Sequence, residues 1–133
     1  MKELPIYALV KPPNRPNIAY RVEIAATPEA RERGFQNRTY LEPHQGMVFL
    51  FPRDQYVSFW MRDTLIPLDI IFVDATGRVL RVVHSAAPRS DQNYTSLSPV
   101  RFVLELAGGT ARRTGIVPGA MIELSGDLPT TVT

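Results

Sequence analysis

Between residues 59 and 73 the chain reads Phe59-Trp60-Met61-Arg62-Asp63-Thr64-Leu65-Ile66-Pro67-Leu68-Asp69-Ile70-Ile71-Phe72-Val73. This apolar run contains the only Trp of the chain, an Arg and two Asp residues. An ionised carboxylate that is buried without a partner is strongly destabilising. We therefore expect Asp69 to be paired, hydrogen-bonded or placed at the rim of a cavity. The segment is the first place to search for a site.

Short strand patterns recur on both sides of this run. Alternating or apolar segments predict strands at 18–26, 47–51, 57–62, 68–73, 79–84, 101–107 and 120–124. The turn Asp74-Ala75-Thr76-Gly77 predicts a hairpin between the strands that flank it. We predict an all-β fold, a β-sandwich or partly open barrel of about seven short, mostly antiparallel strands with one or two short helices.

Two short helices are expected beside the strands. The first covers 28–33, with Thr27 as its N-cap and Gly34 after its end. The second is a single turn within 108–115, ended by Gly115. We expect residues 1–133 to form a single domain, with a proline-rich loop at 11–17 and a frayed tail at 128–133.

The composition excludes several classes of function. The chain has 133 residues, 44% of them hydrophobic, and a formal net charge of +2, which suits one globular domain with its own core. No basic run alternates with aromatic residues, so no nucleic-acid partner is expected. The absence of Cys excludes disulfides and thiolate ligands, and neither His has ligand spacing, so we expect no metal and no cofactor.

The sequence leaves the cellular compartment open. Its first residues lack the pattern of a signal peptide, and no apolar run is long enough to span a bilayer. The protein is expected to be cytoplasmic, or else the mature form of a periplasmic or exported protein whose leader was removed. The oligomeric state is also left open.

Strand alternation sorts the charged residues by face. Trp60 and Arg62 share one face of their expected strand, Asp69 is on the less uniformly apolar face of the next, and Arg101 and Glu105 share a face of a third. If the purely apolar faces form the core and these strands are neighbours, the five side chains converge on one mixed surface.

Three interpretations of that surface are open. A Trp platform flanked by an Arg and carboxylates suits a non-catalytic binding domain for a small polar or carbohydrate-like ligand, which is the function we expect. Asp69 and Glu105 could instead be the acid and base of a hydrolase. In the third interpretation the domain is a structural or partner-binding module, in which Arg62 pairs with Asp69 or Glu105 beneath Trp60 as part of a stabilising ion-pair network.

Several motifs, in this order, resemble the domain of unknown function 192 family: Arg33-Gly34-Phe35 through Arg38, Gly46 to Pro52, Phe59 to Thr64, Ile66 to Phe72, and Val103 to Leu106 with Gly108 or Gly109. The resemblance runs from about Val22 to Ile122. It implies a small β-rich domain of bacteria and archaea, often behind an export signal or lipoprotein leader, and no known reaction.

Two positions depart from the family pattern. Asp63 stands where the family usually has Asn, and Gln36 stands where it usually has an aliphatic residue or Met. A site that needs a neutral amide at position 63 would be altered here, because an ionised Asp only accepts hydrogen bonds. The motif residues that the resemblance puts forward as site candidates are Trp60, Arg62, Asp63, Thr64, Asp69 and Glu105.

Overall fold

The computed structural model describes residues 4–133, and within them nine strands and two short helices. The strands are β1 (Tyr7–Lys11), β2 (Ile18–Ala25), β3 (Gln45–Gln55), β4 (Ser58–Phe59), β5 (Leu68–Val73), β6 (Val79–Ala86), β7 (Tyr94–Thr95), β8 (Val100–Ala107) and β9 (Met121–Ser125). The helices are α1 (Pro28–Arg33) and α2 (Thr110–Thr114).

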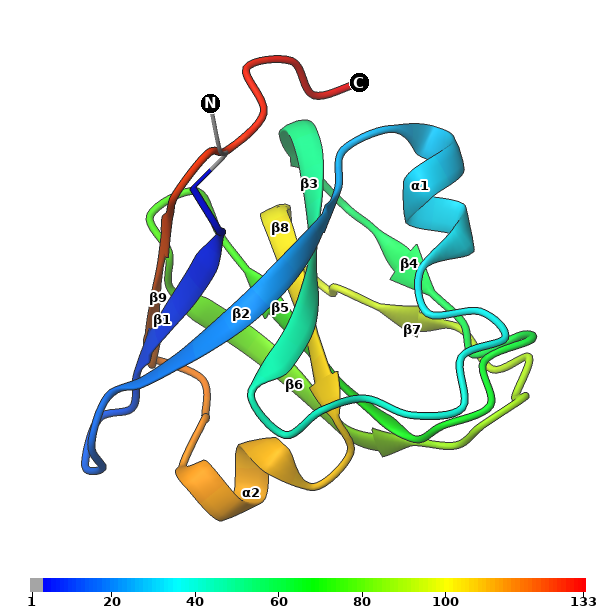
Figure 1. Ribbon diagram of the computed structural model, residues 1–133, viewed down its shortest axis with the longest axis horizontal. Coiled ribbons are helices and arrows are strands. Elements are labelled where there is room, and N and C mark those ends of the chain that lie inside the picture. The colour runs from blue at the N-terminus through cyan, green and yellow to red at the C-terminus, as the bar shows by residue number, and fades with distance from the viewer. Residues whose placement is uncertain (1–3) are drawn as a thin grey trace.

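Seven strands form one strongly curled sheet in the order β6-β5-β8-β3-β2-β1-β9, and β4 pairs with β7 in a small second sheet (Figure 1). The pairing is antiparallel except between β2 and β3, which are parallel because the connection that carries α1 returns the chain to the same end of the sheet. A single β-bridge pairs Arg78, the residue before β6, with Met121 of β9. The prediction of an all-β, partly open barrel is confirmed as a half-barrel.

Both faces of the curled sheet are buried. One apolar cluster includes Ile71, Val73 and Leu104, and packs against residues of the α2 region such as Ala111. The other cluster lies under α1 and the small sheet and contains Phe35, Phe49, Met61, Leu68, Ile70, Phe72 and Val103. Every residue of β5 is consequently buried. The expectation that the purely apolar faces form the core and the mixed faces a common surface is wrong for β5 and β8, because the apolar face of each strand lies in the cluster that holds the mixed face of the other.

The local signals for the first helix and the hairpin are confirmed. The Thr27 hydroxyl accepts a hydrogen bond from the Ala30 N–H at 3.2 Å, and Gly34 ends α1 with φ of 45°. In the hairpin turn the Asp74 carboxylate accepts from the backbone N–H of Thr76, and Gly77 has φ of 90°. A Cβ at Gly77 would lie 2.5 Å from the carbonyl oxygen of Ile122, so the closed corner of the barrel needs Gly there.

The expected strand 57–62 is mostly wrong. Only Ser58–Phe59 pairs with another strand, because the chain turns at Asp63, whose φ is 56°, and the Thr64 N–H donates to the Met61 carbonyl. The sequence patterns do not predict β1 or the two-residue β7, and β3 runs on to Gln55 past Pro52. The tail forms no strand or helix, although the Thr133 N–H donates to the Ala26 carbonyl.

Candidate functional site

A cavity of about 240 Å³ lies between the end of α1, the β4 segment and the covered face of the main sheet. Five of its lining residues are aromatic, and its polar lining residues come from three segments of the chain, 31–36, 58–64 and 105. The aromatic lining residues are Phe35, Phe49, Phe51, Phe59 and Trp60. The polar lining residues are Arg31, Glu32, Arg33, Gln36, Ser58, Arg62, Thr64 and Glu105. Half of the lining residues are polar, which is a larger share than in the usual, mostly apolar small-molecule site and suits a polar ligand.

Glu105 supplies the carboxyl group of the pocket that is most deeply buried. It pairs across the sheet with Ile70 of β5, and it is only 4% exposed. Burial alone raises the pKa of this carboxyl to about 8, and no charged or hydrogen-bonding group among residues 4–133 offsets that effect. At neutral pH the group is therefore mainly protonated, so it can both donate and accept a hydrogen bond.

Asp69 lies on the opposite face of the sheet and is fully buried. Its Oδ1 accepts hydrogen bonds from the N–H groups of Ser85 at 2.8 Å and Gly109 at 3.1 Å, and its Oδ2 accepts one from Ala111 at 2.8 Å. The carboxylate therefore ties the start of α2 and the irregular part of β6 to the sheet. Of the roles expected for it, hydrogen bonding is the one observed.

The structure separates Asp69 from Glu105. In the antiparallel register Ile70, and not Asp69, is the partner of Glu105, and a shift of one residue reverses the face of a strand side chain. The alternative interpretation in which Asp69 and Glu105 are the acid and base of a hydrolase is therefore wrong. The expected ion pair of Arg62 with either carboxylate is also wrong, because the Arg62 Nε donates to Asp91 at 3.0 Å.

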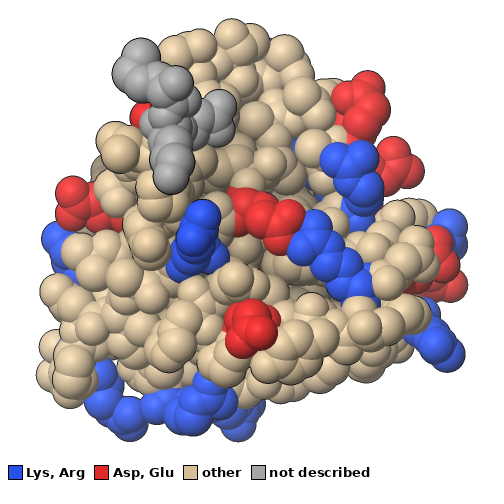
Figure 2. Space-filling model, viewed as in Figure 1, with Lys and Arg blue, Asp and Glu red and all other residues tan. Residues whose placement is uncertain are grey.

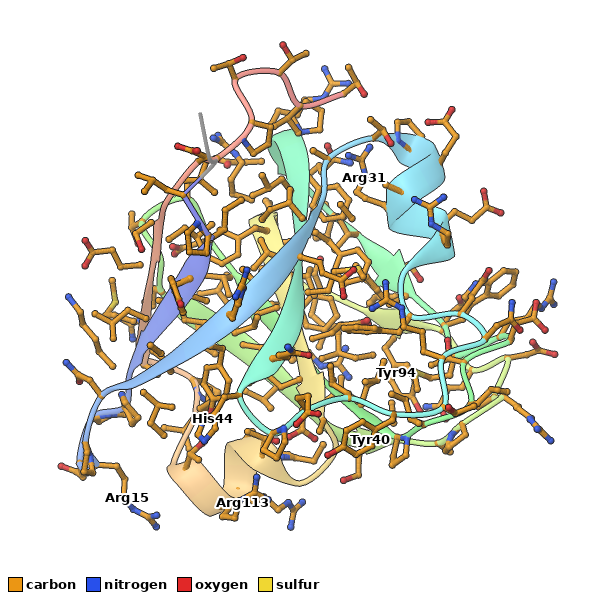
Figure 3. All side chains as sticks on the ribbon, in the orientation of Figure 1. Arg15, Arg31, Tyr40, His44, Tyr94 and Arg113 are labelled. Carbon is orange, nitrogen blue, oxygen red and sulfur yellow. The ribbon has the colours of Figure 1, made fainter. Side chains whose placement is uncertain are left out.

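Two Arg residues of the pocket lining place their guanidinium groups over aromatic rings that also line the pocket. The Arg62 guanidinium lies 3.9 Å from the centre of the ring of Trp60, a residue that is 39% exposed. The Arg31 guanidinium lies 4.9 Å from the Phe51 ring and donates to the Leu50 carbonyl at 2.9 Å. Figure 3 shows Arg31 between α1 and β3. The packing of Trp60 against Arg62 is thus confirmed, with one face of the indole covered.

The remaining candidates have different roles. Thr64 is 5% exposed, lines the pocket and donates its hydroxyl to the Arg62 carbonyl at 3.4 Å. Asp63 does not line the pocket; its left-handed backbone and its carbonyl, which accepts from the Asn37 N–H, shape the turn. Asn and Asp both tolerate such a conformation, so the backbone of this turn accommodates the Asp that departs from the expected family pattern. Arg101 pairs on the surface with Asp54.

Sequence reasoning missed the half of the pocket that α1 and β3 supply. Arg31, Gln36, Phe49 and Ser58 line the cavity, yet they lie in segments whose patterns predict a helix, a loop or core strands. The signal that could have found them is the Arg33-Gly34-Phe35 motif, which enters the sequence analysis only through its family resemblance. A crossover that folds a helix over the sheet is a long-range event that no local pattern contains.

Within residues 4–133, no three side chains of His, Asp or Glu come together in a way that could hold a metal ion. In the same part of the chain, neither helix has the length and apolar character needed to cross a membrane. Charged side chains of both signs are spread over the surface, with a row of basic groups along the lower edge (Figure 2), where Figure 3 places Arg15 and Arg113.

Two solved structures are similar to this one. A protein of unknown function from Novosphingobium aromaticivorans is 37% identical, with 88% of this chain and 83% of that protein covered and a TM-score of 0.85. A protein from Sinorhizobium meliloti, provisionally described as a transcription regulator, is 31% identical, with 95% of this chain and 97% of that protein covered and a TM-score of 0.84. A comparison with curated proteins found no match.

The match to a family model agrees with the motifs and with the fold. It extends over residues 10–124, which includes the whole of the pocket, and the family is described as "Uncharacterized ACR, COG1430". The chain belongs to the DUF192 family.

Proposed function

We propose that this domain binds a small polar, carbohydrate-like ligand in the pocket at Glu105, without catalysing a reaction. The observation that carries the proposal is the Glu105 side chain itself. It is 4% exposed, lines the cavity and has no charged or hydrogen-bonding partner among residues 4–133. A polar group so largely buried needs a partner, and because the Glu105 oxygens are not fully closed off from solvent, that partner is a molecule in the cavity, either water or a ligand.

The other polar groups of the pocket support a hydroxyl-bearing ligand. The Gln36 amide, the Ser58 hydroxyl and the Thr64 hydroxyl line the same cavity, and each can donate as well as accept. The aromatic walls would hold the C–H surfaces of such a ligand. The volume of about 240 Å³ lies below the usual range of drug-sized sites, which suits a molecule the size of a monosaccharide.

Binding is favoured over catalysis for a structural reason. Hydrolysis of a glycoside needs two carboxyl groups on either side of the scissile bond. The sheet places the Asp69 carboxylate on the face opposite Glu105, where three backbone N–H groups hold it. Asp69 therefore cannot act with Glu105 as the acid and base of such a mechanism, and the other carboxyl group of the lining is that of Glu32 on α1.

Trp60 makes a direct binding assay possible, since it is the only Trp in the chain and it lines the pocket. We expect titration with glucose, mannose or glucuronate to change its fluorescence in a saturable way. Glu105→Leu, which replaces the acid by an apolar side chain in apolar surroundings, should abolish that change. The matched control Glu123→Leu, at an exposed position on β9, should leave it intact.

Two outcomes would overturn the proposal. One is the absence of a saturable change with all three sugars while circular dichroism shows a folded protein. The other is equal affinity for a sugar in the parent chain and in Glu105→Leu, which would place binding elsewhere.

A further inference from the structure

We infer that the ligand of this pocket is a hydroxylated organic acid whose carboxylate binds the Arg31 guanidinium while its hydroxyl groups reach Glu105. The inference rests on the proposed function and adds the charge of the ligand to it. It follows from three properties of the pocket: an Arg without an acidic partner, a positive balance of charge at the lining residues, and aromatic faces that are already covered.

Arg31 has the properties of an anion-binding residue. Its guanidinium is held in one place by the Leu50 carbonyl and the Phe51 ring. The ion pairs among residues 4–133 involve Lys11, Arg38, Arg62 and Arg101, and none involves Arg31. Loss of solvent lowers the pKa of Arg31, with Glu29 opposing the effect only in part. A bound carboxylate would accept two parallel hydrogen bonds from such a group.

The balance of charge among the lining residues favours an anion. Arg31, Arg33 and Arg62 line the cavity together with two carboxyl groups, those of Glu32 and Glu105. Asp91 neutralises Arg62, which leaves the α1 side of the pocket as the source of net positive charge. Glu105 adds little negative charge at neutral pH, because burial keeps most of it protonated. An ammonium ligand would therefore meet more repulsion from these guanidinium groups than attraction from Glu32.

The aromatic rings argue against recognition by stacking alone. Guanidinium groups lie over Phe51 and over Trp60, so one face of each ring is already in contact with a cation. Phe59 packs edge to face against Phe49 with ring centres 5.0 Å apart. The rings therefore shape the cavity and position the guanidinium groups, and the polar side chains determine which ligand binds.

Three sugars of the same ring size test the inference: glucuronate, glucose and glucosamine, titrated separately at pH 7 with Trp60 fluorescence as the readout. We expect glucuronate to bind about tenfold more tightly than glucose, as one charge-assisted hydrogen bond would give, and glucosamine to bind more weakly than glucose. Arg31→Gln should reduce the preference for glucuronate over glucose to within about twofold, because only the anion uses that charge.

The control variant is Arg112→Gln, which removes the same charge from an exposed position on α2, away from the pocket lining. It should retain the full preference for glucuronate. Equal binding of glucose and glucuronate would overturn the inference and leave the proposed function standing, and so would preferred binding of glucosamine. Failure of all three sugars to bind would overturn the proposed function itself.

A second readout needs no ligand. Iodide and caesium ions quench Trp fluorescence by collision, so their relative efficiency reports the sign of the charge around Trp60. We expect Arg31→Gln to lower the ratio of the iodide to the caesium quenching constant relative to the parent chain, and Arg112→Gln to leave that ratio unchanged. A ratio unchanged by Arg31→Gln would overturn the placing of an anion site at the pocket.

Discussion

Replacing Glu105 by Gln should stabilise the protein at neutral pH. The carboxyl has a pKa of about 8 in the fold against an ordinary value of 4.5, so the folded state holds a proton that the unfolded chain releases. Stability from this group is complete below pH 4.5 and is lost progressively as pH rises towards 8. Between pH 4.5 and pH 7 the parent chain should lose up to about 3 kcal/mol of its free energy of unfolding through this group. Glu105→Gln should not lose it, because the amide stays neutral in both the folded and the unfolded state.

Urea unfolding of the parent chain and of Glu105→Gln between pH 4 and pH 8 measures this difference. The two proteins should have similar free energies of unfolding near pH 4, where the side chain at this position is neutral in both folds. The variant should become the more stable of the two as pH rises. Of the charged groups that line the same pocket, Arg31, Glu32, Arg33 and Arg62, none shifts the Glu105 pKa.

The matched control is Glu123→Gln, the same change at an exposed carboxylate that pairs with Lys11. It should alter stability by less than about 1 kcal/mol at any pH in this range. A pH-independent difference between Glu105→Gln and the parent chain, or a variant less stable than the parent at pH 7, would refute the reasoning. Either result would mean that Glu105 is ionised and compensated in the fold.

Three further predictions concern Asp69, Gly77 and the basic edge. Asp69→Asn should lower the free energy of unfolding by about 2–4 kcal/mol in urea titrations, because an amide cannot accept all three of the N–H groups that the carboxylate holds; an unchanged value would contradict this role. Gly77→Ala should lower the melting temperature in calorimetry, because position 77 combines φ of 90° with a Cβ site 2.5 Å from the Ile122 carbonyl oxygen. The control Ala75→Gly, in the same turn, should change the melting temperature much less. The protein should not bind duplex DNA of mixed sequence in a gel-shift assay at about 150 mM salt, because its net charge is only +2 and its two helices have only six and five residues. A gel shift that disappears as the salt concentration rises would contradict this and would show that the basic edge near Arg15 binds phosphates.

Much of the fold follows from local chemistry. The N-cap at Thr27, the hairpin at Gly77 and the helical turn before Gly115 each depend on neighbouring residues, and each is where the sequence predicts it. The expected strand at 57–62 is cut short because Asp63 takes a left-handed conformation, which its residue type permits but does not require. Local propensity alone does not choose between a strand and a turn there.

The site was harder to predict than the fold, and the reason is register. Alternation correctly put Glu105 and Asp69 on defined faces of their own strands, but it could not say which residues of β5 and β8 stand opposite each other. The pairing of Ile70 with Glu105 sends the two carboxyl groups to opposite sides of the sheet. The crossover that places α1 over that face then creates the pocket from residues far apart in the sequence.

The most direct test of the central claim is a chemical-shift map of the ¹⁵N-labelled protein titrated with glucuronate. Binding in the proposed pocket predicts saturable shifts concentrated at residues 31–36, 58–64 and 105, with the β1 and β9 strands unaffected. The same titration of Glu105→Leu should show no saturable shifts. Shifts absent from these segments in the parent chain, or concentrated elsewhere on the molecule, would contradict the claim that this cavity is a ligand site.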